Sequence, residues 1–179
     1  IVVMAGLWSA NYIKRVSNAY LFGYPLVIMD LTRQLMEKSW QDTDRPNNSF
    51  HHLQDFPDHT FKNVVRPNND TLYSIAWLDL SDQPLILSVP ETQGRYYVIP
   101  LMDAWTNVFA SVGKRTSGTH ASQHMIVGPQ WNGDENPEMT LIRAPTNMVW
   151  IIGRIQTNGK ADIPAVVQLQ QGFTLTPQS

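Results

Sequence analysis

The stretch that decides the fold is Val64–Leu80, VVRPNNDTLYSIAWLDL. Pro67 has no backbone N–H to continue a strand, and the Asn and Asp residues after it favour a turn. From Thr71 onward the sequence has a period of two, which predicts a strand. One face carries Leu72, Ser74, Ala76 and Leu78, and the other carries Tyr73, Ile75, Trp77 and Asp79. Because both faces are largely apolar, we expect this strand inside a sandwich or beneath a partner.

Further strands are predicted downstream, because β-branched and aromatic residues recur between turn signals. The connections are mostly short, and short connections imply antiparallel pairing. Asp162–Gln171 predicts a short helix with Pro164 tolerated in its first turn. The predicted strands are Leu85–Val89, Arg95–Met102, Thr106–Val112, Met125–Val127 and Asn147–Gln156.

Upstream of the decisive stretch, Trp8–Lys38 is predicted to be helical. Apolar residues recur there every three or four positions, and Pro25 predicts a kink or two helices that meet. The sequence therefore predicts an α+β fold: a kinked N-terminal helical segment, an antiparallel sheet or sandwich of about six strands, and a short C-terminal helix. We expect one domain over 1–179, with a helical head (1–40) and a strand-rich body (61–177). The apolar stripe of the helix comprises Val16, Tyr20, Tyr24, Val27, Leu31 and Leu35.

The composition restricts the classes of function. Charged residues make up only 16% of the chain and hydrophobic residues 42%, so we expect part of the surface to be covered by another domain or subunit. The net charge of −2 gives no basic surface for nucleic acid. No apolar run is long enough to cross a bilayer. The absence of Cys excludes disulfides and thiolate chemistry, and it suits an oxidising compartment.

The polar corner before the first strand has two interpretations. Asn and Asp side chains bond to nearby backbone, so the corner can be a self-bonded turn. Alternatively it is a polar cluster at the mouth of a strand, with Asp70 as an acid or base and Arg66 as an anion clamp. In that second interpretation the binding side chains are Asn68, Asn69 and Tyr73.

A second candidate segment is Met102–Asn107, MDAWTN. Alternation places Asp103, Trp105 and Asn107 on one side of the chain, where they could form one wall of a pocket. The alternative is a buried Trp105 with Asp103 as a cap. On the late strand, Arg154 is expected among apolar neighbours, where it needs a carboxylate partner. Its candidate partners are Asp70, Asp79 and Asp103.

The sequence contains no motif for a metal or cofactor. His120 and His124 are four residues apart, but the acid of the H-E-x-x-H pattern is absent. In a strand, unlike a helix, two residues with this spacing lie far from each other. We therefore predict no metal site and no cofactor.

Blocks over about four-fifths of the chain resemble the bacterial domain of unknown function 1254. The resemblance implies that a second domain, domain of unknown function 1214, follows this one, and that the protein is exported. It brings no established activity or catalytic residues. The blocks are AYLFGYPLVIMDLTR (19–33), NSFHH (48–52), FKNVVRPNNDTLYSIAWLDLSDQPLILSVPE (61–91), RYYVIPLMDAWTNVFASVGKRTSGT (95–119), IVGPQWNG (126–133), APTNMVWIIGRIQTNGKAD (144–162) and VVQLQQGFTLTP (166–177).

Two hypotheses for the function follow. The first is the substrate- or ligand-binding part of a small-molecule enzyme, with a pocket walled by 66–73 and 103–107. The second is a non-catalytic assembly domain that packs on a missing C-terminal domain or on other copies in a homo-oligomer. We expect an exported or periplasmic protein rather than a cytoplasmic one, in which Ile1–Leu7 is a processing remnant or a core segment.

Overall fold

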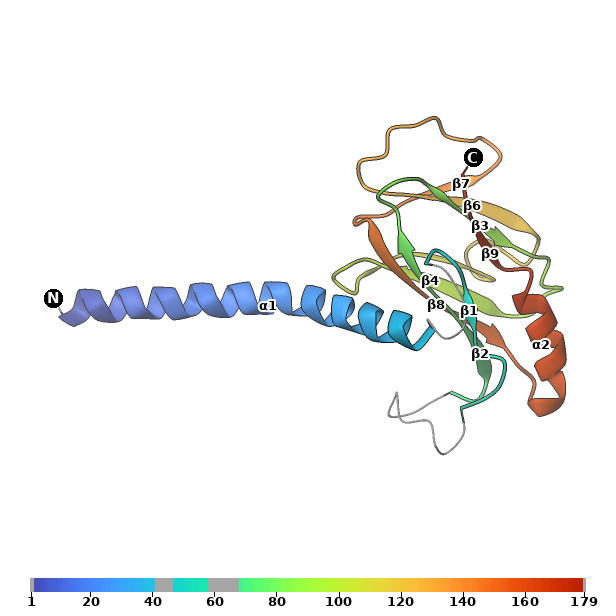
Figure 1. Ribbon diagram of the computed structural model, residues 1–179, viewed down its shortest axis with the longest axis horizontal. Helices are drawn as coiled ribbons and strands as arrows, with labels where there is room; N and C mark the ends of the chain where they lie inside the picture. Colours follow the sequence, from blue (N-terminus) through green and yellow to red (C-terminus); the bar gives the residue numbers. More distant parts are fainter. Residues whose placement is uncertain (1, 41–46, 58–67, 179) are drawn as a thin grey trace.

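The computed structural model of the chain describes residues 2–40, 47–57 and 68–178 (Figure 1). Within this part a long helix precedes a sandwich of two β-sheets, and a short helix lies near the C-terminal end. The α+β class predicted from the sequence is confirmed. The described residues of the body form nine strands, so the prediction of about six was too low.

The larger sheet, sheet A, has five antiparallel strands. Their order is β1 (His51–His52), β2 (Thr71–Asp79), β8 (Met148–Gln156), β4 (Tyr97–Met102) and β5 (Val108–Gly113). β2 and β8 lie side by side along their full length, so the strand part of the stretch that decided the fold is in the interior of the sheet. The predicted boundaries of β2 and β8 differ from the observed ones by a single residue.

The smaller sheet, sheet B, has four strands. Their order is β7 (Thr140–Arg143), β6 (Ser122–Val127), β3 (Leu85–Val89) and β9 (Thr174–Pro177). β6 and β7 pair in parallel, which corrects the prediction of antiparallel pairing throughout. The connection 128–139 explains this exception, because parallel pairing needs a crossover of about a dozen residues.

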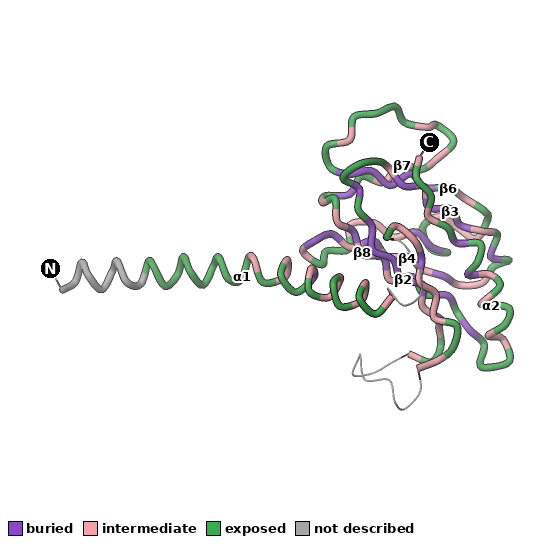
Figure 2. Tube along the Cα trace, viewed as in Figure 1, coloured by how far each residue is buried: buried purple, intermediate pink, exposed green. Residues whose placement is uncertain are grey.

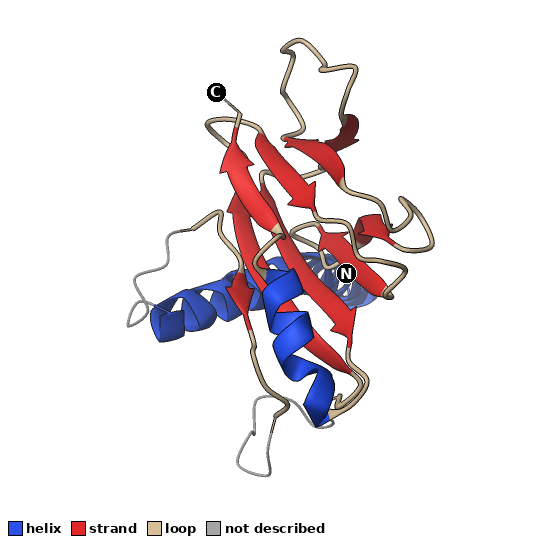
Figure 3. Cartoon of the chain, turned by 90° about the vertical axis from the view of Figure 1, so that its right-hand side faces the viewer, coloured by secondary structure: helices blue, strands red, loops and turns tan. Residues whose placement is uncertain are grey.

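The hydrophobic core lies between the two sheets. Alternate residues of β2, β4 and β8 face those of β3 and β6, as the period of two predicts. The short helix α2 (Ile163–Gln170) closes part of this core with Val166, which is fully buried. In Figure 3, α2 and the long helix lie on opposite sides of the strands. The core residues of the strands include Leu72, Ala76, Leu85, Leu87, Ile99, Leu101, Ile126 and Ile151.

The long helix α1 (Val2–Trp40) runs through Pro25 without ending. The alternative of two helices that meet at Pro25 is therefore wrong. Loss of one N–H is tolerated at this position because the preceding turn is exposed, with Leu21 68% accessible, so water can bond the freed carbonyl. Most of α1 extends away from the sandwich, and only its C-terminal part lies against it (Figures 1 and 2).

Two ring contacts and one buried side chain place this C-terminal part on the outer face of sheet A, where Phe22 remains 66% exposed. The Phe22 ring lies 5.6 Å from the Trp105 ring, the Trp40 ring stacks on His51 at 4.9 Å, and Met29 is buried. Phe22, Met29 and Trp40 are seven and eleven residues apart, so they share one side of a helix with 3.6 residues per turn. The outer face of sheet A is thus partly covered by α1.

Candidate functional site

The polar corner before β2 is bonded to itself. The Asn68 side chain donates to Thr71 Oγ1 over 2.9 Å and accepts from the backbone N–H of Asp70 over 2.6 Å. The Asp70 carbonyl accepts from the Thr157 N–H, while Asn69 and Asp70 are exposed. Arg66 lies outside the described residues. These contacts are those of a turn that fixes the start of the strand.

The Asp103–Asn107 segment closes the hairpin between β4 and β5. Asp103 is only 5% exposed, and its Oδ1 accepts from the backbone N–H groups of Trp105 and Asn107, both over 2.9 Å. The Asn107 side chain donates to Asp103 Oδ2 over 3.1 Å. The structure therefore brings Asp103 and Asn107 together in a turn, and the Asp103 carboxylate is used for local bonds.

The described parts of the two predicted pocket walls, 68–73 and 103–107, lie at different positions along β8. Thr71, beside the corner, pairs with Gln156, whereas Met102, beside the hairpin, pairs with Trp150. Six residues of strand correspond to roughly 20 Å, so the structure does not bring the two segments together.

Arg154 has a different partner from the expected one. It is exposed, and its guanidinium lies over the ring of Tyr73, 5.5 Å from the centroid. No ion pair joins it to Asp70, Asp79 or Asp103, all of which the structure describes. The expectation of a burial-driven ion pair is wrong because Arg154 is on the outer face of sheet A, where water solvates the charge.

A cavity of about 310 Å³ lies between α1 and the end of sheet A where β8 begins. Sequence reasoning missed it, although Asp30, Arg33 and Glu37 have the spacing of side chains that meet on one helical face. The lining residues are Asp30, Arg33, Glu37, Asn47, Trp77, Leu78, Asp79, Ser81, Asn147 and Met148.

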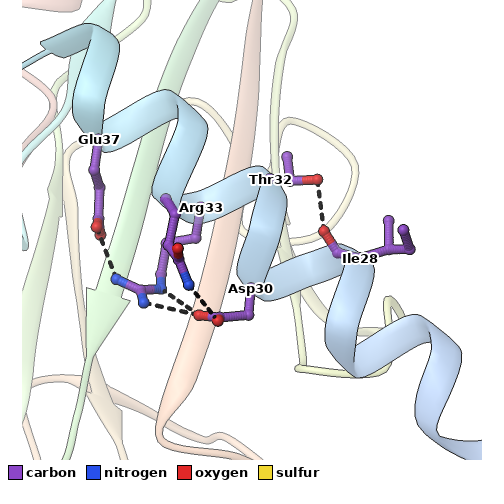
Figure 4. A network of polar contacts seen from close by, with 6 residues as sticks. Ile28, Asp30, Thr32, Arg33 and Glu37 are labelled. Carbon is purple, nitrogen blue, oxygen red and sulfur yellow. Dashed lines mark hydrogen bonds and ion pairs between the residues drawn. The ribbon is translucent and has the colours of Figure 1, made fainter.

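Arg33 is held between two of these carboxylates (Figure 4). It donates to Asp30 Oδ1 over 2.8 Å and to Glu37 Oε2 over 2.7 Å. The hydrogen bond from Arg33 lowers the pKa of Asp30, and hydrogen bonds from Ser81 lower the pKa of Asp79, with a smaller contribution from Arg33. Three carboxylates surround one guanidinium, so the cavity carries an excess of negative charge.

Sequence reasoning also missed a buried polar cluster on the core side of β2. Ser74 Oγ lies 2.9 Å from His52 Nδ1, and the Gln170 side chain donates to Ser74 Oγ and to the Tyr73 carbonyl. A serine beside a histidine is one requirement of a nucleophilic site. Ser74 is only 2% exposed, however, so in this structure its hydroxyl fastens α2 to β2 and is not open to a substrate.

The described residues contain neither a metal-binding cluster nor a membrane-spanning helix. No three His, Asp or Glu side chains gather there in a way that could hold a metal ion. His120 is exposed beside Glu91, whereas His124 is buried in β6. No described helix is long and apolar enough to span a bilayer.

The exposed hydrophobic side chains are concentrated on α1. All but one of the large ones in the described residues belong to this helix, and Val108 on β5 is the exception. Figure 2 shows the exposed stretch of α1 pointing away from the sandwich. Exposed apolar surface on this scale is typical of a face that another body covers.

The comparisons place the chain beside proteins of unknown function. Residues 47–177 match the family described as "Protein of unknown function (DUF1254)". The crystal structure of the VPA0106 protein from Vibrio parahaemolyticus has a similar fold, with a TM-score of 0.70 and 27% sequence identity. The match covers 90% of this chain but only 37% of that one. No curated protein matches.

Proposed function

Since the chain belongs to the DUF1254 family, whose description gives no activity, we propose from the structure that it is a non-catalytic assembly domain of a longer protein. The observation that carries this proposal is the exposed apolar surface of α1, on a domain whose sandwich already has a complete core. Water-exposed apolar surface costs free energy that burial against another body recovers.

Three further observations support assembly over catalysis. The polar groups of the corner and the hairpin bond to their own neighbours, which is what fixed turns require. The chain spans little more than a third of the length of the solved relative, so that relative has ample chain for a second domain. Charged residues make up only 16% of the sequence.

The partners follow from the same proposal. A C-terminal domain of the type described as domain of unknown function 1214 is the first candidate, and other copies in a homo-oligomer are the second. The lack of cysteine is in keeping with an exported protein, and cell fractionation of the natural host tests that location.

The experiment uses the product of the full reading frame. We expect that a protease cut after residue 179 leaves the two parts bound to each other, so that they co-elute in size-exclusion chromatography. Elution of two separate parts would contradict the assembly proposal.

A second function, binding of a small organic cation, is favoured by the cavity between α1 and sheet A. Its volume is at the lower end of that of ligand sites, and Asp30, Glu37 and Asp79 outnumber Arg33. We expect choline or putrescine to bind, and Asp79→Asn to weaken binding at least about fivefold, since the charge it removes faces the cavity. Asp82→Asn, an exposed carboxylate outside the cavity lining, is the matched control. Calorimetry that detects no heat with either amine would contradict this role.

A further inference from the structure

The helix α1 has two apolar faces. The first, defined by Met29 and Trp40, faces sheet A; Phe22 on the same side touches Trp105 but stays 66% exposed. The second, here called the outward stripe, comprises Tyr20, Tyr24, Val27, Leu31 and Leu35. At 100° per residue, Val27, Leu31 and Leu35 lie on roughly the opposite side of the helix from Met29. The stripe identified from the sequence therefore points away from the domain that the structure describes.

The outward stripe is unusually apolar for a surface that faces water. Leu31 is 48% exposed and Leu35 is 69% exposed, and the rings of Tyr20 and Tyr24 lie 5.5 Å apart along the helix. A surface helix normally has one apolar side towards its domain and a polar side towards water. A helix that is apolar on two opposite sides has the pattern of an element packed between two bodies.

The coverage of the comparison structure supports one candidate for this second body. Residues 47–177 make up less than three-quarters of the chain, whereas the structural match covers 90% of it, so the match extends into α1. The relative thus has a counterpart of at least part of this helix within a chain that is more than twice as long. In a longer chain of this kind, the remainder of the same polypeptide is favoured over a separate molecule as the body that covers α1, because the tether raises its effective concentration.

We propose that the outward stripe is the docking surface for the remainder of the longer polypeptide, which packs on α1 from the side opposite sheet A. This inference rests on the proposed assembly function and adds to it the surface and the occupant. α1 is then an interdomain helix, covered on one side by the sandwich and on the other by the second body.

Single cysteines test the docking surface, because the 179 residues contain none. Leu31→Cys and Leu35→Cys are made in the full-length protein after any cysteines elsewhere are replaced by serine. Gln168→Cys, on the exposed side of α2, is the matched control on another helix. We expect a maleimide to label positions 31 and 35 at least about tenfold more slowly than position 168.

Three results would overturn the inference. Equal labelling rates at the three positions would show an uncovered stripe. Protection that disappears on dilution would identify a second copy as the occupant. Protection that appears only with phosphatidylcholine–phosphatidylglycerol vesicles would identify a membrane surface.

A second measurement covers the case in which a variant does not fold. Hydroxyl-radical oxidation of the unmodified full-length protein reports the same surface, with exposed Pro164 as reference, and we expect Leu31 and Leu35 to be protected. The assembly proposal has its own test: it is refuted if the two parts elute apart after the cut at residue 179. Co-elution of the two parts together with fast labelling at positions 31 and 35 would refute the docking surface and leave the assembly proposal intact.

Discussion

The carboxylate of Asp103 accepts hydrogen bonds from both the backbone N–H and the side-chain amide of Asn107, four residues further along the chain. These bonds close the β4–β5 hairpin around Thr106, which has a positive φ of 68°. A positive φ is costly for a β-branched residue, so the hairpin needs the compensation that Asp103 provides. The hairpin in turn holds Trp105 against Phe22 of α1.

We predict that Asp103→Ala lowers the free energy of unfolding by about 1–3 kcal/mol, because it leaves the N–H groups of Trp105 and Asn107 without their acceptor. Urea denaturation measures the change. Asp82→Ala, at an exposed position, is the control and is expected to change stability by less than about 0.5 kcal/mol. Equal effects of the two substitutions would refute the structural role of Asp103.

Alanine substitution at two glycines, Gly153 and Gly23, is predicted to change stability in opposite directions. A Cβ at Gly153 would lie 2.9 Å from the Ser74 carbonyl oxygen, so Gly153→Ala must push β8 away from β2 and should destabilise by about 1–3 kcal/mol. A Cβ at Gly23 meets nothing within 4 Å, so Gly23→Ala should raise the helicity of α1 and stabilise it by up to about 1 kcal/mol. Thermal unfolding and circular dichroism measure both. A neutral Gly153→Ala would show that the two central strands are less closely packed.

The docked face of α1 yields a third prediction. Met29 is 2% exposed, so Met29→Ala in the 179-residue chain should release α1 from sheet A at a cost of about 2 kcal/mol or more. Hydrogen exchange of the amides between residues 22 and 40 reports the release. Leu35→Ala, on the outward stripe, is expected to change exchange by less than a factor of two. If both substitutions had the same effect, the distinction between the two faces would be lost.

Burial of His124 makes stability depend on pH. Desolvation lowers the pKa of His124 below its ordinary value of 6.5, so the folded protein holds the ring neutral. Between the lowered pKa and 6.5 the unfolded chain binds more protons, and stability is lost as the pH falls through this window. We predict that His124→Gln loses less stability than the native chain between pH 7 and pH 5.

The exposed His120 is kept in both chains, so that the native and His124→Gln chains differ only at position 124. Denaturation curves of the two chains at several pH values measure this pH dependence. An identical pH dependence in the His124→Gln and native chains would assign the acid sensitivity to other groups.

The alternation of side chains predicted the central strands closely but not the edges. β2, β3 and β8 are long enough for a period of two to be visible, and their observed bounds lie within a residue of the predicted ones. The missed strands β1, β7 and β9 have two to four residues, too few for a period to emerge. They become strands because a longer neighbour offers its free N–H and C=O groups for pairing.

The sequence by itself determined the main helix and the central strands, the α+β class and the turn chemistry at Asn68, because all of these depend on neighbours within a few residues. Only the tertiary structure decided that 68–73 and 103–107 lie beside different positions of β8, since register depends on pairing between distant strands. It also decided which side of α1 is covered. The apolar stripe read from the sequence points outward, because Met29 is buried and Trp40 stacks on His51 on the opposite side of the helix, which faces sheet A.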